Sequence, residues 1–171
     1  KAGCNIAKAF SKFPQYQTFG IDANTDADIT IKAKKSHEEY DSAFPDLKRK
    51  LKFKDEDVLV VIAGAGKISG GSLRLLEQLQ KNRLTVLYIE GDLSIMSEVQ
   101  KKQEKIVSSV LQEYARSGLL ERIIMVNNAH IERSIGDMSI IGYYDTLNQA
   151  IVNIIHMTNV FRHSEPVIGN F

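Results

Sequence analysis

Two strongly apolar runs constrain the fold of this chain more than any other feature. Residues 58–63 read VLVVIA and residues 84–89 read LTVLYI, so neither has the polar and apolar alternation of a half-exposed strand. Strands of this kind are buried on both faces, as in a parallel sheet covered by two layers of helices. Between them, Leu73, Leu76 and Leu79 have helical spacing. This region therefore predicts two parallel strands joined by a helix.

The alternation of strands and helices continues through the rest of the chain. Periodicity predicts helices over 6–13, 96–116 and 139–162, strands over 16–22 and 122–126, and a helical segment within 38–52 interrupted near Pro45. The apolar stripe of the 96–116 helix is formed by Val99, Ile106, Val110 and Tyr114. The order predicts an α/β fold: a doubly wound, mainly parallel, Rossmann-like sheet with helices on both faces.

The chain divides into one domain and the beginning of another. We expect residues 1–162, including the long helix 139–162, to form a single domain, and residues 163–171 to start a connection to a second domain. Neither end has the form of a natural terminus, so we expect a longer parent protein.

Composition narrows the class of protein. The 171 residues are 43% hydrophobic, with 22 basic and 21 acidic side chains and a net charge of +1. This balance gives no reason to expect nucleic-acid or membrane partners. Cys4 is the only cysteine, which fits a reducing, cytoplasmic location. The histidines have no metal-ligand spacing, so no metal site is predicted.

Ligands of doubly wound sheets bind at the carboxyl ends of the strands, so the loops there are the candidate sites. The opening turn Ala2-Gly3-Cys4-Asn5 leads directly into a helix, whose first N–H groups can bind phosphate. The alternative is that small residues are needed where this helix starts against the sheet.

The glycine-rich loop over residues 64–72, GAGKISGGS, follows a buried strand and opens a helix, as an anion-binding loop would. It is not a P-loop, because Lys67 is followed by Ile68. It is not a dinucleotide fingerprint, because Ser69 replaces the third glycine. A turn that needs glycine for structural reasons is the alternative interpretation.

Two side-chain pairs share helix faces at a spacing of four residues. Tyr144 and Asn148 could stack on a purine and read its edge, although a tyrosine at this spacing is more often part of the core. Glu98 and Lys102 are the second pair, and most such pairs are solvated ion pairs.

In this order, the loops resemble the nucleotide-binding half of the tubulin/FtsZ family. The matching segments are residues 1–7 (KAGCNIA), 20–27 (GIDANTDA), 61–66 (VIAGAG), 127–128 (NN) and 139–148 (SIIGYYDTLN). The strand that precedes the first of these loops in the family is missing from this sequence.

The resemblance implies a domain that binds GTP or GDP, with Mg²⁺ as a candidate companion ion, and a parent protein that forms head-to-tail filaments with itself. Hydrolysis in the family is completed by a neighbouring subunit, through residues that would lie beyond Phe171. The nucleotide-binding positions implied are Gly3, Cys4, Asn5, Asn24, Gly64, Gly66, Lys67, Ser69, Gly70, Gly71, Glu98, Lys102, Asn128, Tyr144 and Asn148.

The chain also departs from the family. Lys67 and Ile68 replace two glycines of the signature loop, and residues 28–51 contain no glycine where the γ-phosphate loop should lie. One alternative is therefore a degenerate structural or interaction module with weak or no nucleotide binding. A nicotinamide- or flavin-binding domain is a further alternative, disfavoured by Ser69 and by the positions of Asn24 and Asp26.

Overall fold

The computed structural model of the chain describes residues 2–53, 56–136 and 141–165. In chain order the elements are α1 (Ala2–Phe10), β1 (Ile21–Asp22), β2 (Ile29–Thr30), α2 (His37–Ser42), β3 (Asp57–Ala63), the 3₁₀-helix η1 (Lys67–Gly71), α3 (Ser72–Leu79), β4 (Arg83–Ile89), α4 (Glu98–Arg116), β5 (Arg122–Val126), α5 (Asn128–Ile135) and α6 (Tyr143–His163). Strands and helices alternate as the apolar pattern predicts.

All described strands pair in parallel, in two sheets. The larger sheet has the order β3-β4-β5, and β1 pairs with β2 in the smaller one. Ala63 is in register with Ile89, and Ile89 with Val126, so the three strands of the larger sheet end at one edge. The predicted α/β class with parallel strands is confirmed.

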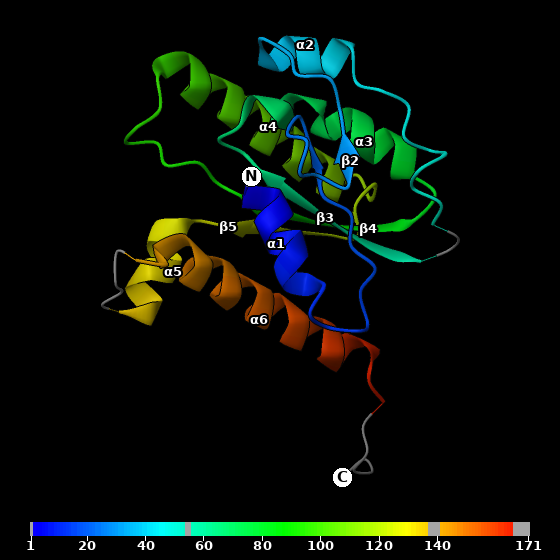
Figure 1. Cartoon of the computed structure of the whole chain (residues 1–171), viewed down its shortest axis with the longest axis vertical. Helices are drawn as coiled ribbons and strands as arrows, with labels where there is room; N and C mark the ends of the chain where they lie inside the picture. Colours follow the sequence, from blue (N-terminus) through cyan, green and yellow to red (C-terminus); the bar gives the residue numbers. More distant parts are fainter. Residues whose placement is uncertain (1, 54–55, 137–140, 166–171) are drawn as a thin grey trace.

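Helices cover both faces of the larger sheet (Figure 1). Along β4, Val86 and Tyr88 point into a core shared with α3 and α4, whereas Leu87 and Ile89 point into a core shared with α1 and α6. This alternation follows from the two-residue period of a strand. Both faces of β4 are therefore buried, as its unbroken apolar sequence requires.

Four predicted elements differ from the observed ones. The predicted helix 6–13 is observed as α1, which begins at Ala2 and ends at Phe10, so the predicted opening turn Ala2–Asn5 is itself helical. Only Ile21–Asp22 of the predicted strand 16–22 pairs as a strand, because residues 16–20 have no ladder partner among the described residues. The helical segment within 38–52 shortens to α2. The predicted long helix begins at Tyr143, and residues 139–140 lie outside the described part of the chain, as do residues 166–171 of the expected connection to a second domain.

Helix α5 was not predicted. The sequence suggested a loop after β5, but the Asn127 side chain accepts a hydrogen bond from the Ala129 N–H at 2.9 Å and so caps a helix. Asparagine is one of the preferred residues at this position.

The buried face of α4 is also not the predicted apolar stripe. Val99 and Ile106 are 64% and 63% exposed, whereas Glu104, Val107 and Leu111 are buried. None of the helices in the described ranges combines the length and apolar character that crossing a membrane requires.

Candidate functional site

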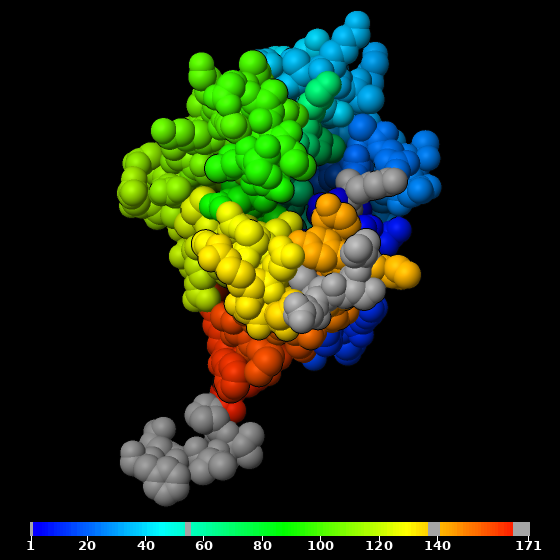
Figure 2. Space-filling model, turned by 90° about the vertical axis from the view of Figure 1, so that its left-hand side faces the viewer, coloured from blue at the N-terminus to red at the C-terminus, as the bar shows by residue number. Residues whose placement is uncertain are grey.

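The loops that follow β3, β4 and β5 begin side by side at one edge of the sheet. The Gly64 N–H donates to the Ile89 carbonyl oxygen, and the Glu90 N–H donates to the Val126 carbonyl oxygen, each at 2.9 Å. The Asn127 amide then donates to the Glu90 carboxylate at 2.8 Å. Figure 2 shows the segments after β4 and β5 and the start of α6 together on one face (green, yellow and orange). This edge is where a doubly wound sheet binds its ligand.

The first turn of α1 lies against the end of β3. A Cβ atom added at Gly3 would be 3.7 Å from the Val61 carbonyl oxygen, so the backbone there approaches the strand closely. The Cys4 thiol lies 3.9 Å from the Asp22 carboxylate. Burial, and then the charge of Asp22, raise the pKa of this thiol, so it stays protonated at neutral pH. Asn5 is exposed, and of these three residues it is the one most open to a ligand.

Three glycines of the loop after β3 are explained by packing. A Cβ atom at Gly64 would overlap the hydroxyl group of Tyr88. At Gly70 it would overlap the backbone of His37, and at Gly71 the ring of Phe44. Gly70 and Gly71 are both buried, under α2 and the loop that follows it.

The serine of this loop also has a structural partner. Ser69 is 4% exposed, and its hydroxyl lies 2.7 Å from the Gly66 carbonyl oxygen and 3.2 Å from that of Gly64. The hydroxyl therefore closes the loop on itself. Gly66 and Lys67 are exposed, so they form the tip of the loop that remains free to contact an anion.

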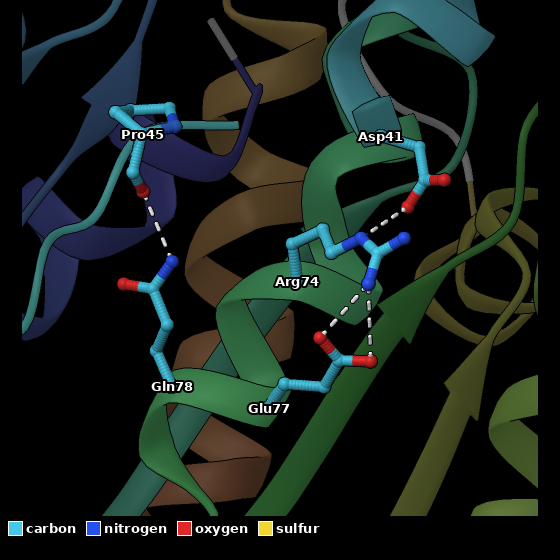
Figure 3. Close-up of polar contacts among 5 residues, drawn as sticks. All are labelled: Asp41, Pro45, Arg74, Glu77 and Gln78. Atoms are coloured by element: carbon cyan, nitrogen blue, oxygen red, sulfur yellow. Dashed lines mark hydrogen bonds and ion pairs between the residues drawn. The ribbon is translucent and has the colours of Figure 1, made fainter. Parts of the chain in front are cut away.

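Polar contacts with α3 hold α2 over the buried glycines (Figure 3). The Arg74 guanidinium donates to the Asp41 carboxylate at 3.0 Å and is paired with Glu77 at 3.2 Å. The Gln78 amide donates to the Pro45 carbonyl oxygen at 2.9 Å. These contacts are exposed and individually weak, but together they hold α2 in place over the buried glycines of the β3 loop.

The most unusual buried group at this edge is Glu104, which sequence reasoning missed. It is 7% exposed, and one carboxylate oxygen accepts a 2.5 Å hydrogen bond from the Gly91 N–H. Burial raises the pKa of this carboxyl group. Burial, and then the charge of Glu104, raise the pKa of the Tyr88 phenol. Glu104 shares the helical face of Val107 and Leu111, a spacing that could have revealed it.

Four of the candidates lie on the helices α4 and α6. Tyr144 is 71% exposed, with its ring packed edge-on against Tyr143 at 5.2 Å, and Asn148 is half-buried one turn along α6. Glu98 forms an ion pair with Lys101 at 2.8 Å rather than with Lys102.

Asn24 and Asn128 follow β1 and β5. The Asn24 side chain accepts a hydrogen bond from the Asp26 N–H at 3.4 Å, which shapes its own loop. Asn128 is the first residue of α5. Asn24 therefore lies in a loop after a strand, as the sequence predicts, whereas Asn128 lies in a helix instead of the predicted loop.

Some of the candidate site residues line a groove of ≈ 800 Å³. Gly3, Cys4, Gly66 and Ser69 line one end of it, together with Gly71. The residues that line it do not include the predicted positions on α4, α5 and α6, nor Asn5, Asn24, Gly64, Lys67 and Gly70. Within the described residues, no cluster of histidine, cysteine or acidic side chains could hold a metal ion.

Comparison with known proteins adds no family to these observations. No protein-family model matches the chain, and no curated protein matches it. The functional interpretation therefore depends on the loops themselves.

Proposed function

We propose that this chain binds a guanine nucleotide, GDP or GTP, at the carboxyl edge of its sheet, as the nucleotide-binding part of a tubulin/FtsZ-like protein. The observation that carries the proposal is the meeting of two phosphate-type elements at one end of the groove. These are the first turn of α1, at Gly3, and the tip of the β3 loop, at Gly66, which both line the groove. Lys67 follows Gly66 and is exposed, but it does not line the groove itself. Helix N-termini and lysine side chains both favour phosphate.

The exposed ring of Tyr144 and the half-buried amide of Asn148 are the proposed base-binding pair. A tyrosine that is 71% exposed offers a free face on which a purine can stack. An asparagine side chain can both donate to and accept from the edge of guanine. The resemblance further suggests that the parent polymerises head-to-tail and that a neighbouring subunit completes hydrolysis. We therefore expect slow or absent GTP hydrolysis by this chain alone.

The second candidate is a degenerate module of the same family that serves structure or interaction. The observation in its favour is the packing role of Gly64, Ser69, Gly70 and Gly71. In this interpretation the loop keeps its glycines for contact with Tyr88 and α2, and the nucleotide is no longer needed.

Calorimetric titration of the purified chain with GDP, GTP and ADP separates the two. We expect GDP and GTP to bind more tightly than ADP, because the pairing of Asn148 with a base edge distinguishes guanine from adenine. Equal affinities, or no binding of any of the three, would remove the guanine assignment and favour the second candidate.

A pair of asparagine variants on α6 sharpens this test. Asn148→Ala should weaken GDP binding roughly tenfold or more, since a polar partner left unpaired costs about 1–3 kcal/mol. Asn153→Ala is the matched control, because Asn153 is exposed and accepts a hydrogen bond from Gln149 at 2.8 Å on the same helix. If both variants bind equally well, Asn148 has a structural role instead.

The exposed tip of the β3 loop can be tested separately. Lys67→Ala should reduce affinity for GDP but leave affinity for guanosine unchanged, because the lysine charge acts on phosphate alone. A parallel loss for guanosine would show that the substitution disturbs the loop rather than a phosphate contact.

A further inference from the structure

Helix α4 carries an apolar stripe that is exposed along most of its length. Val99 and Ile106 are 64% and 63% exposed, and Val110 is half-buried. Their spacings of seven and four residues put all three on one side of the helix. Exposed apolar side chains continue at both ends of α4, with Ile95 just before it and Leu119 just after it, at 82% and 55% exposed. In Figure 2 this green part of the chain lies on the surface of the molecule.

The stripe is separate from the side of α4 that packs into the core. Glu104, Val107 and Leu111 form that buried side. At 3.6 residues per turn, Ile106 lies about 160° around the helix from Glu104. Single apolar residues on a surface are ordinary, but a row of them along one helix marks an interaction site. The stripe therefore has the form of a helix-packing surface without a partner among the described residues.

An open depression on this side of α4 can take a side chain from another helix. It has a volume of ≈ 410 Å³ and is lined by Lys102, Lys105, Ile106, Ser109 and Val110. Packed helices insert the side chains of one helix into such depressions on the other. Neither lysine has an ion-pair partner within the described ranges, so both remain available to an acidic group of a partner.

The charges along α4 have an order that fits a second copy of the same helix. Glu98 and Lys102 lie in its first turns, whereas Glu113 and Arg116 lie in its last. If two such helices run in opposite directions and are centred between positions 107 and 108, Lys102 of each faces Glu113 of the other, and Glu98 lies near Arg116. A parallel pair would instead place each charge opposite its own copy. Exposed ion pairs within one copy, such as that of Glu98 with Lys101 at 2.8 Å, are weak enough to be exchanged.

The same antiparallel register brings the apolar side chains together. Ile106 of one copy faces Ser109 and Val110 of the other, which line the depression. Ile95, before the start of one helix, comes near Leu119, after the end of the other. One arrangement therefore buries the stripe and matches the charges beside it.

We propose that α4 is a self-association surface, through which two copies of the chain pack α4 against α4 in antiparallel orientation about a twofold axis. Each copy presents the same stripe, so every ion pair forms twice. The opposed directions also bring helix ends of opposite partial charge together. Helix α4 has 19 residues, or a length of about 28 Å at 1.5 Å per residue. A contact of this size is small, so we expect a weak dimer with a Kd on the order of 10 μM. Glu98 and Lys102 then serve this contact rather than the nucleotide.

Sedimentation equilibrium of the 171-residue chain measures this association directly. No nucleotide is present, so the test stands apart from the proposed function. The variants are Ile106→Glu, the single charge reversals Lys102→Glu and Glu113→Lys, and the double reversal that combines them. Ile135→Glu is the matched control, because it places the same charge on an exposed apolar side chain of α5. Circular dichroism of each variant checks that the fold is retained.

We expect Ile106→Glu to weaken the dimer about 100-fold and each single reversal to weaken it about tenfold, whereas Ile135→Glu has no effect. The double reversal should restore the Kd to within about threefold of the natural value, because each new glutamate then faces a new lysine of the other copy.

Three results would overturn the proposal. The first is a natural chain that stays monomeric up to about 200 μM, well above the expected Kd. The second is a dimer that survives Ile106→Glu, which would belong to another exposed surface, such as that of Phe161 on α6. The third is a double reversal that associates no better than the single ones, because the antiparallel register requires the rescue.

Discussion

Strands β3 and β4 are both mainly apolar but have different surroundings. β4 is paired on both edges, and Leu84 and residues 86–89 are all at most 6% exposed. β3 is paired on one edge, and only Val60 and Ile62 are buried. The apolar sequence of a strand therefore indicates that the strand is suited to burial. The exposure of its side chains depends on which neighbouring elements cover it.

The difference identifies β3 as a strand whose sequence fits a central position but which lies at an edge among the described residues. Exposed edge strands are normally short, charged or covered, because they pair readily with other chains. Val58, Leu59 and Val61 of β3 are apolar and only half-buried. The groove beside them is the structural consequence.

Truncating one leucine in each strand should give the largest difference between the two strands in lost unfolding free energy. Leu87→Ala in β4 removes a fully buried side chain of the core shared with α1 and α6, and should cost about 3 kcal/mol of unfolding free energy. Leu59→Ala removes a partly buried side chain that packs against the same core, and should cost about 1 kcal/mol. Urea unfolding of both variants measures the difference. Equal losses would mean that the groove beside β3 is filled in solution.

A glycine pair at the end of β3 gives the next largest effect. Gly64→Ala should destabilise the chain by about 2 kcal/mol, because the added methyl group overlaps the Tyr88 hydroxyl of β4. Gly66→Ala is the control: its backbone has φ −93° and ψ 144°, and the nearest atom to an added Cβ is 3.6 Å away. We expect the control to change stability by less than about 0.5 kcal/mol. A neutral Gly64→Ala would show that Tyr88 can move aside.

The sequence predicted the strands of the larger sheet well because each is defined by its own apolar run. Residues 58–63 and 84–89 lie within β3 and β4, and β5 matches its predicted range. The predicted strand 16–22 was mostly wrong, because strand pairing depends on a partner strand and a local sequence pattern does not show that partner. Helix α5 was not predicted, because its start depends on the capping side chain of a single asparagine.

The candidate site was less predictable for a different reason. A glycine can let a ligand approach the backbone, or it can let another part of the protein pack closely against it. The sequence alone does not distinguish these two roles. In the β3 loop, Gly70 and Gly71 serve packing against α2, which comes from a distant part of the chain. The buried face of α4 was misassigned because its central member, Glu104, is a charged residue that hydrophobic periodicity ignores.

The smallest predicted effect concerns Glu104, which lies where the loops after β3 and β4 meet. Burial raises its pKa above the ordinary value of 4.5, so the folded state holds the proton more tightly than the unfolded state. Its contribution to stability is therefore fully present below that value and is lost as pH rises through the folded pKa. Glu104→Gln keeps a carbonyl oxygen that can accept from the Gly91 N–H and has no proton to lose.

We therefore expect the two proteins to be similarly stable near pH 4, and the natural protein to lose stability relative to Glu104→Gln as pH increases towards 8. Urea unfolding of both across this range measures the difference, in which titrations common to the two proteins cancel. The carboxylate of Glu90 raises the pKa of Glu104 further, so Glu90→Gln should reduce the pH dependence. A natural protein that instead gains stability with pH over the variant would mean that the Gly91 hydrogen bond outweighs burial. Glu104 would then be a charged anchor of the β4 loop.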